Sequence, residues 1–195
     1  MSFGSNHWKN RGRECEPPQP EPLAYFLTWS SYGTWLPGDE RGWVRYRRGM
    51  QLPDPIVERE AKARMKEDAC RLDHEERRLV ESTIADHCRA RGWTLYAVNC
   101  RSNHVHVVVA ATVHDPKTMR EQFKAWCTRR LKELADARRR PITPQATSGD
   151  VIREKWWAER GSGLYLNDEE SLEAVIDYVQ LAQDPPRDRQ HEERP

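Results

Sequence analysis

The sequence predicts an α+β fold in which helices pack against an antiparallel sheet of four or five strands. Two observations carry this prediction. Segments that alternate like strands are separated by long segments whose apolar residues recur at helical spacing. Two of the strand segments are joined by only three residues, which suits a hairpin and therefore antiparallel pairing. A length of 195 residues with 37% hydrophobic residues allows one well-packed domain.

That single domain is expected over residues 23–183, between two tails. Residues 1–22 are polar and contain four prolines in a short stretch, and residues 184–195, DPPRDRQHEERP, have the same character. Such compositions bury too little apolar surface to become ordered. We therefore expect a mobile tail at each end.

The first half of the domain is predicted to contain one strand, one loop and two helical pieces. LAYFLTWSSY, from Leu23 onward, alternates as a strand, and the stretch GTWLPGDERGW, residues 33–43, is a loop dense in Gly and Pro. Residues 56–91 are charged with spaced apolar positions, which indicates two helices broken near Asp73. Gly92 is expected to cap the second helix at its C-terminus.

The second half is predicted to begin with a hairpin and to end with a helix. WTLYAVNC and HVHVVVA are the two hairpin strands, joined by the turn RSN. Asp115 and Pro116 open a helix over about 116–138. One or two short strands are expected within 151–166. Asn167 is then predicted to cap the last helix, DEESLEAVIDYVQLAQ, which a following Asp-Pro-Pro stops.

Composition narrows the class of protein. The net charge of +1 excludes a globally basic nucleic-acid binder, although a neutral total can conceal a local basic stripe. Cysteines at positions 15, 70, 88, 100 and 127 form no Cys-x-x-Cys pair, which is typical of reduced thiols. No apolar run approaches the roughly 18 residues that a membrane span needs. We expect a cytoplasmic protein without a membrane partner, with association with the nucleoid left open.

The segment HVHVVV carries two histidines that an aliphatic strand does not need. Successive side chains of a strand alternate faces, so His104 and His106 project to the same side. Three interpretations compete. In the first, the two histidines are half-buried residues whose hydrogen bonds are made by neighbouring groups. In the second, they belong to a histidine-triad hydrolase. In the third, they bind a divalent metal ion that acts on a phosphodiester. The second interpretation is weakened by Val108, where a third histidine would stand.

A metal-assisted attack on a phosphodiester also needs a nucleophile, and the last helix offers a tyrosine. Its buried stripe is formed by four apolar residues, namely Leu172, Val175, Ile176 and Val179. Tyr178 lies about 120° from the centre of that stripe, near the sheet yet accessible. Gln183 falls within about 20° of the centre if the helix persists that far, where its amide either reaches water or supplies a ligand oxygen.

A local basic stripe and exposed aromatic residues favour a polyanionic substrate. Residues 117–140 contain nine basic and three acidic residues, although such runs are by default only solvated helix faces. The predicted phosphate contacts on this helix are Arg120, Lys124, Arg129 and Arg130. Trp35 and Trp43, in the Gly/Pro loop, are candidates for stacking on unpaired bases, with capping of a sheet edge as the alternative.

Together these motifs resemble the single-tyrosine HUH transposases of the IS200/IS605 type, and within them the relatives associated with repetitive extragenic palindromes. The resemblance covers roughly residues 23–183, in the order of the family. The matching motifs are YFLTW in the first strand, NHVHVVV in the hairpin, FKAW in the middle helix and AVIDYV in the last helix.

The resemblance implies a ferredoxin-like antiparallel sheet flanked by helices, a homodimer, and single-stranded DNA with hairpin or palindromic elements as substrate. It implies that His104 and His106 bind Mg²⁺ or Mn²⁺ and that Tyr178 forms a 5′-phosphotyrosine intermediate. The glutamine ligand of the family would stand at Ala182, so Gln183 and Gln180 are the nearest candidates for the third ligand. A phenol is protonated at neutral pH, so activity is expected to require the metal and to rise with pH.

The sequence therefore predicts a metal-dependent single-stranded DNA endonuclease and strand transferase. The alternative is a host-adopted nucleic-acid-binding protein that keeps the fold but no longer cuts. Several points stay open: the hairpin and cleavage sequence, whether the gene is mobile, the third ligand, the role of residues 33–43, and whether the tyrosine serves its own protomer or a partner.

Overall fold

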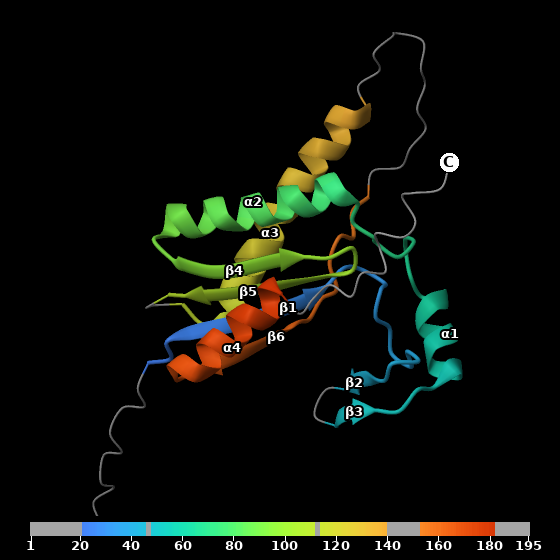
Figure 1. Ribbon diagram of the computed structural model, residues 1–195. Coiled ribbons are helices and arrows are strands. Elements are labelled where there is room, and N and C mark those ends of the chain that lie inside the picture. The colour runs from blue at the N-terminus through green and yellow to red at the C-terminus, as the bar shows by residue number, and fades with distance from the viewer. Residues whose placement is uncertain (1–20, 46–47, 112–113, 140–152, 182–195) are drawn as a thin grey trace, which may run out of the picture.

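The computed structural model describes residues 21–45, 48–111, 114–139 and 153–181. The two predicted mobile tails lie almost wholly outside these ranges, as does Gln183. Figure 1 shows a central sheet with helices on both sides and a separate excursion that contains α1. None of the described helices combines the length and the apolar character needed to cross a membrane.

A four-stranded sheet forms the centre of the protein. Its strands are β1 (Ala24–Ser30), β4 (Thr94–Cys100), β5 (His104–Ala110) and β6 (Ser162–Leu166). They pair in the order β4-β5-β1-β6, and every neighbouring pair is antiparallel. The helix α2 (His74–Arg91) connects β1 to β4, and α3 (Pro116–Arg139) connects β5 to β6. This β-α-β-β-α-β order is that of a ferredoxin-like fold and confirms the predicted α+β class.

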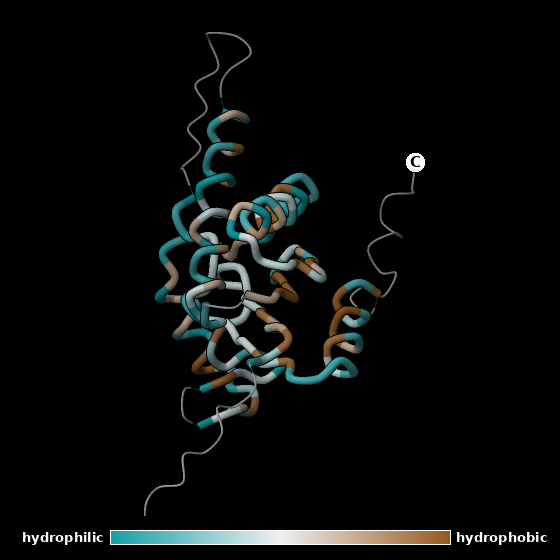
Figure 2. The backbone as a smooth tube through the Cα atoms, turned by 90° about the vertical axis from the view of Figure 1, so that its left-hand side faces the viewer, coloured by the Kyte–Doolittle hydropathy of each residue, from teal (hydrophilic) through white to brown (hydrophobic). Residues whose placement is uncertain are grey.

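Helices cover the two faces of the sheet unequally. One face packs against α2 and α3 through the main apolar core, which includes Trp29, Val107 and Phe123. The opposite face packs against α4 (Glu169–Gln180) through a smaller cluster that includes Val108 and Val179. Figure 2 views the molecule from the side and shows α4, with many apolar residues, separated from α2 and α3. His104 and His106 project toward the α4 face, since they alternate with the core valines of β5.

Local capping interactions set the helix ends, and most were predictable. Asp73 caps α2 in a capping box with Glu76, and Gly92 ends that helix with a left-handed φ of 67°. The prediction that Asn167 caps the last helix was wrong by one residue. Asp168 is the cap, because its carboxylate accepts hydrogen bonds from both the backbone N–H and the hydroxyl of Ser171 at 2.8 Å.

Between β1 and α2 the chain leaves the sheet. This excursion contains the two-stranded hairpin of β2 (Trp43–Arg45) and β3 (Gly49–Gln51), followed by α1 (Pro55–Ala63). The sequence predicted only a loop over residues 33–43 and missed these two strands, which are three residues each. Asp54 caps α1 by accepting hydrogen bonds from the backbone N–H groups of Ile56 and Val57.

The described cysteines are free thiols, as the spacing predicted. Cys70, Cys88, Cys100 and Cys127 are all buried and unpaired by disulfides. Burial raises the pKa of Cys70 to about 11 and that of Cys88 to about 12, which makes both thiols poor nucleophiles.

Candidate functional site

A polar row crosses all four strands on the face of the sheet that α4 covers. Cross-strand pairing places Asn99 and Thr28 on either side of His106, and Ser162 beside Thr28. The hydroxyl oxygens of Thr28 and Ser162 lie 2.6 Å apart. The adjacent row, two residues along each strand, is apolar and consists of Ala97, Val108, Phe26 and Leu164. The sheet therefore changes from an apolar floor under α4 to a polar floor at His106.

The two histidines and the tyrosine predicted from the sequence meet at this boundary. The ring centroids of His104 and His106 are 4.6 Å apart, with the rings at 85° to each other. Tyr178 lies near the C-terminal end of α4, and its ring centroid is 5.8 Å from that of His106. The tyrosine side of the site is open to solvent, because Tyr178 is 46% exposed.

Phe26 packs against both His106 and Tyr178. Its ring is stacked on His106 at a centroid distance of 5.5 Å and an interplanar angle of 12°. It also meets the Tyr178 ring edge-on at 6.2 Å. These aromatic contacts favour the observed arrangement of the two rings. The sequence motif YFLTW contained Phe26, but its contact with the site is visible only in the structure.

His106 is held in its neutral form. The residue is only 9% exposed, and its Nδ1 is buried with no hydrogen-bond partner among the described residues. Burial lowers the pKa of His106 to about 4, with smaller contributions from the positive charges of His104 and Arg101. The imidazole is therefore uncharged at neutral pH, which is the form that binds a metal ion.

Asn103 orients the other histidine. Its side-chain Oδ1 lies 2.7 Å from Nδ1 of His104, and an amide oxygen only accepts, so that nitrogen carries the proton. The Asn103 backbone carbonyl accepts hydrogen bonds from the Ser31 N–H at 2.9 Å and the Thr34 hydroxyl at 3.1 Å. With Nδ1 protonated, Nε2 is the nitrogen that carries the lone pair in the neutral ring. Partners of this kind fix the tautomer of metal-binding histidines.

The two histidines fit a divalent cation, and the remaining ligands must be oxygen atoms from elsewhere. One imidazole has an unpartnered buried nitrogen and the other has a fixed tautomer, which suits metal ligation. No third His, Cys, Asp or Glu joins them within the described ranges. The predicted third ligand, Gln183, lies beyond the described residues, and α4 ends at Gln180. Gln183 as the third ligand therefore stays a prediction.

Two of the predicted phosphate contacts are buried instead of exposed. Lys124 donates hydrogen bonds from Nζ to the carbonyl oxygens of residues 158, 159 and 160 at 2.9, 3.1 and 3.2 Å. Burial lowers its pKa. Arg120 is 8% exposed, and its guanidinium lies 3.6 Å from Glu121. Both residues lie on the same side of α3 as Met119 and Phe123, which face the core. The prediction that Arg120 and Lys124 belong to an exposed row of phosphate contacts is therefore wrong.

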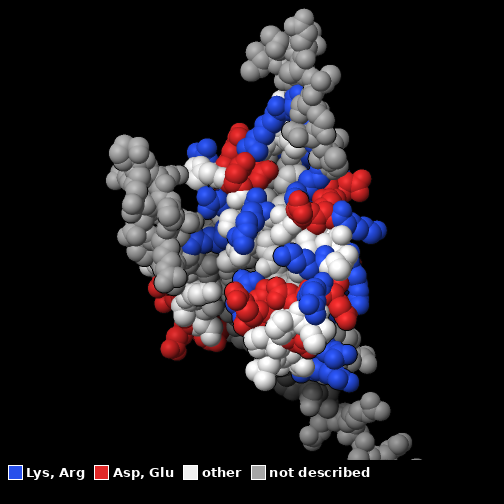
Figure 3. Space-filling model, turned by 90° about the vertical axis from the view of Figure 1, so that its right-hand side faces the viewer, with Lys and Arg blue, Asp and Glu red and all other residues white. Residues whose placement is uncertain are grey.

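The other two basic residues of the predicted stripe are on the surface. Arg129 and Arg130 are exposed and both pair with Glu133, at 3.4 and 2.7 Å. Figure 3 views the side of the molecule that carries α1, and there basic and acidic side chains are interspersed. A contact of Arg129 or Arg130 with DNA stays a prediction.

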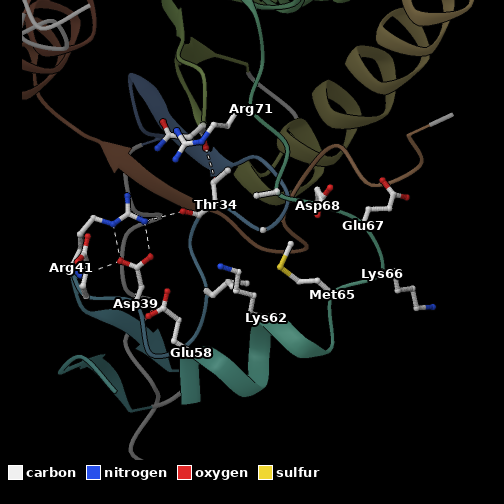
Figure 4. A pocket seen from close by; sticks show the side chains of 15 residues that line it. Thr34, Asp39, Arg41, Glu58, Lys62, Met65, Lys66, Glu67, Asp68 and Arg71 are labelled. Atoms are coloured by element: carbon white, nitrogen blue, oxygen red, sulfur yellow. Dashed lines mark hydrogen bonds and ion pairs between the residues drawn. The ribbon is translucent and has the colours of Figure 1, made fainter. Parts of the chain in front are cut away.

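A groove of about 870 Å³ lies between the loop after β1 and α1. The loop after β1 forms one wall, and α1 with residues 65–71 forms another, as Figure 4 shows. Asn103, the partner of His104, also lines it. Charges of both signs lie in the groove, including Arg41, which forms two hydrogen bonds of 2.7 Å to the Asp39 carboxylate.

The two tryptophans of this region have defined partners. Trp35 is 45% exposed, donates a hydrogen bond to the Gly42 carbonyl at 2.8 Å and lies under the guanidinium of Arg41. Trp43 begins β2 and donates to the Leu52 carbonyl at 3.2 Å. Both side chains therefore help to fold the excursion, and stacking on bases stays a prediction.

Comparisons with known proteins place the chain near two transposase structures. No family model matches the sequence, and no curated protein matches it. A candidate transposase from Deinococcus radiodurans R1 is similar with a TM-score of 0.40 and 14% identity, over 84% of this chain and 93% of that chain. A REP-associated tyrosine transposase bound to a REP hairpin is similar with a TM-score of 0.44 and 12% identity, over 100% of this chain and 89% of that chain. At this similarity, the argument for function depends on the site itself.

Proposed function

We propose that the protein is a single-tyrosine HUH transposase, a metal-dependent enzyme that nicks and joins single-stranded DNA near hairpins. One observation carries the proposal. Tyr178 from the last helix and the paired histidines of β5 meet on one face of the sheet, with 5.8 Å between the ring centroids of His106 and Tyr178. A nucleophile beside a pair of imidazoles is the combination that metal-assisted attack on a phosphodiester needs.

The proposed reaction has two transfer steps. In the first, the Tyr178 oxygen attacks the scissile phosphorus and the phenolic proton leaves to solvent, while the bond from phosphorus to the 3′ oxygen breaks and that oxygen takes up a proton from solvent. The products are a 5′-phosphotyrosine and a free 3′-hydroxyl. In the second, another 3′-hydroxyl attacks the same phosphorus, forms a new phosphodiester and releases the tyrosine. The number of phosphate ester bonds is conserved, so strand joining needs no ATP.

Each group at the site has a role in this scheme. A Mg²⁺ or Mn²⁺ ion held by His104 and His106 would supply Lewis-acid polarisation of the phosphate. In the neutral ring of His104, Asn103 directs the proton to Nδ1, and burial keeps His106 neutral. Phe26 packs against the rings of both His106 and Tyr178.

We further propose that the tyrosine acts in cis. Tyr178 and both histidines belong to the same chain, and the rings of His104 and Tyr178 both contact that of His106. A homodimer stays a proposal from the sequence resemblance, and this site does not need one to bring the three side chains together.

The decisive experiment is trapping of the covalent intermediate. The purified protein is incubated with Mn²⁺ and a pool of hairpin-bearing single-stranded oligonucleotides, and a denaturant-resistant adduct is sought by gel and by mass spectrometry. Tyr178→Phe is the matched control, because it removes only the hydroxyl. We expect an adduct with the wild type and none with the variant.

The same experiment separates the alternative function. An adduct that persists in Tyr178→Phe rejects this nucleophile. Binding of the oligonucleotides without any adduct from the wild type rejects the enzyme and favours a non-cleaving nucleic-acid-binding protein.

A further inference from the structure

Asn99 connects the sheet to the end of the helix that carries Tyr178. Its side-chain Nδ2 donates a hydrogen bond to the backbone carbonyl of Val179 at 3.0 Å. Val179 is fully buried and follows Tyr178 directly in α4. In the sheet, Asn99 is also the cross-strand partner of His106. One side chain therefore stands beside the histidine and holds the helix turn of the tyrosine.

The position of this hydrogen bond matters because the last carbonyls of a helix have no partner within the helix. The last carbonyl groups of α4 lie close to Tyr178 in the sequence. The helix is only 12 residues long, and a helix of this length has marginal stability without tertiary contacts. Most of its contact with the sheet is apolar, through residues such as Val175, Ile176 and Val179. Apolar packing is not directional, so it tolerates a slide or rotation of the helix that a hydrogen bond of fixed geometry resists.

Such a slide or rotation would displace Tyr178 relative to His106. Tyr178 is 46% exposed and touches the site through the ring edges of Phe26 and His106. Small displacements of a reacting group reduce rates strongly, by about 100-fold for a shift of 1 Å.

We propose that Asn99 is a positioning residue, which holds the last turn of α4 on the sheet and so keeps the Tyr178 oxygen aimed at the site of the two histidines. This inference rests on the proposed function for its effect on catalysis. Its structural part, the restraint of α4, stands on the hydrogen bond between Asn99 and Val179. Asn99 acts through the helix and contacts neither the metal nor the phosphate.

The test compares three substitutions of Asn99 with one control. Asn99→Asp keeps the shape but replaces the donor by a carboxylate that repels the Val179 carbonyl, Asn99→Ala removes the group, and Asn99→Gln keeps an amide donor. Thr94→Ala, at the exposed start of the same strand, is the control. The readouts are the rate and DNA dependence of adduct formation, hydrogen exchange of residues 169–181 in the free protein, and Mn²⁺ binding by calorimetry.

We expect Asn99→Asp and Asn99→Ala to form adduct at least about tenfold more slowly at saturating DNA, with an unchanged KM for DNA. Amides at the C-terminal end of α4 should exchange faster in both variants, whereas those of α2 and the control should not change. Asn99→Gln should recover part of the rate. Mn²⁺ affinity should stay the same in Asn99→Ala.

Three results would overturn the inference. Unchanged exchange in α4 would show that Asn99 does not restrain the helix. An unchanged adduct rate with faster exchange would show that the restraint has no catalytic effect. A loss of Mn²⁺ affinity in Asn99→Ala would make Asn99 a ligand instead. If the wild type forms no adduct, the proposed function fails together with the catalytic effect, and the exchange measurement alone still decides whether the restraint exists.

Discussion

The ring of Tyr178 stands almost perpendicular to that of His106, at 86°, although one residue comes from the last helix and the other from an inner strand. The tyrosine side chain is 46% exposed, whereas the imidazole is buried, so the site has one accessible side and one buried side. The predictions below test the groups that support the arrangement and the surfaces around it.

Asn103 is predicted to strengthen metal binding without contacting the metal. Its Oδ1 fixes the tautomer of His104, and loss of such partners typically weakens metal affinity by about 10–100-fold. Asn103→Ala should lower Mn²⁺ affinity in calorimetry by that factor, and Asn103→Asp, which keeps an acceptor, should restore it. Equal affinities of Asn103→Ala and the wild type would contradict the role given to Asn103.

Lys124 is predicted to stabilise the fold and not to bind DNA. Its ammonium donates to three carbonyl oxygens in the segment before β6, and hydrogen bonds to charged groups contribute about 1.5–3 kcal/mol each. Lys124→Met should lower the free energy of unfolding in urea by about 1.5–3 kcal/mol or more. It should leave the salt dependence of oligonucleotide binding unchanged.

The matched control for Lys124 is Lys117→Met, at an exposed position of the same helix. This variant should be close to the wild type in stability, because surface substitutions usually change it by less than about 0.5 kcal/mol. A Lys124→Met variant as stable as Lys117→Met would reject the structural role.

Arg129 and Arg130 test the part of the basic stripe that the structure leaves on the surface. If either arginine neutralises a DNA phosphate, its replacement by Gln should weaken oligonucleotide binding and reduce the slope of log K against log salt by about 0.7. Fluorescence anisotropy over a salt series measures both. Arg89→Gln removes an equally exposed arginine that pairs with Asp86 on α2, and it should leave the slope unaltered. Identical slopes in all variants would show that neither arginine neutralises a DNA phosphate.

Asp73 is predicted to make stability depend on pH. Burial acts to raise its pKa, but hydrogen bonds from Arg138 and from the backbone of α2 outweigh burial, so the pKa of Asp73 is lowered. A carboxyl group with a lowered pKa in the folded state stabilises the protein above its ordinary pKa, about 3.9, and loses that effect as the pH falls through the lower folded value.

Asp73→Asn keeps a capping side chain but removes the charge, so it isolates this effect. We expect it to cost about 0.5–1 kcal/mol at pH 7, since the pair with Arg138 is partly exposed. Urea unfolding at pH 7 and at pH 3 should show the difference shrinking at the lower pH. If the wild type and the variant differ in free energy of unfolding by the same amount at pH 7 and pH 3, the loss of stability comes from capping geometry and not from charge.

Local sequence patterns were sufficient for most elements of the central domain, though not for β2 and β3, and they singled out the three side chains at the centre of the site. Alternation identified β1, β4 and β5, and helical spacing identified α2, α3 and α4. Alternation also placed His104 and His106 on one face, and helical geometry placed Tyr178 at the margin of its buried stripe. These features depend on interactions within a few residues of the chain, which the sequence displays directly.

Tertiary structure decided everything that depends on which surfaces meet. The burial of Arg120 and Lys124 follows from the side of α3 that faces the core, and a run of basic residues does not reveal that side. The polar row through Asn99, Thr28 and Ser162 depends on strand register, and the bond from Asn99 to Val179 depends on the docking of α4. By itself the sequence singled out the residues that we propose to carry the chemistry. Only packing between distant segments determined which residues hold them in place, because register and helix docking minimise the free energy of the whole chain and not of any one segment.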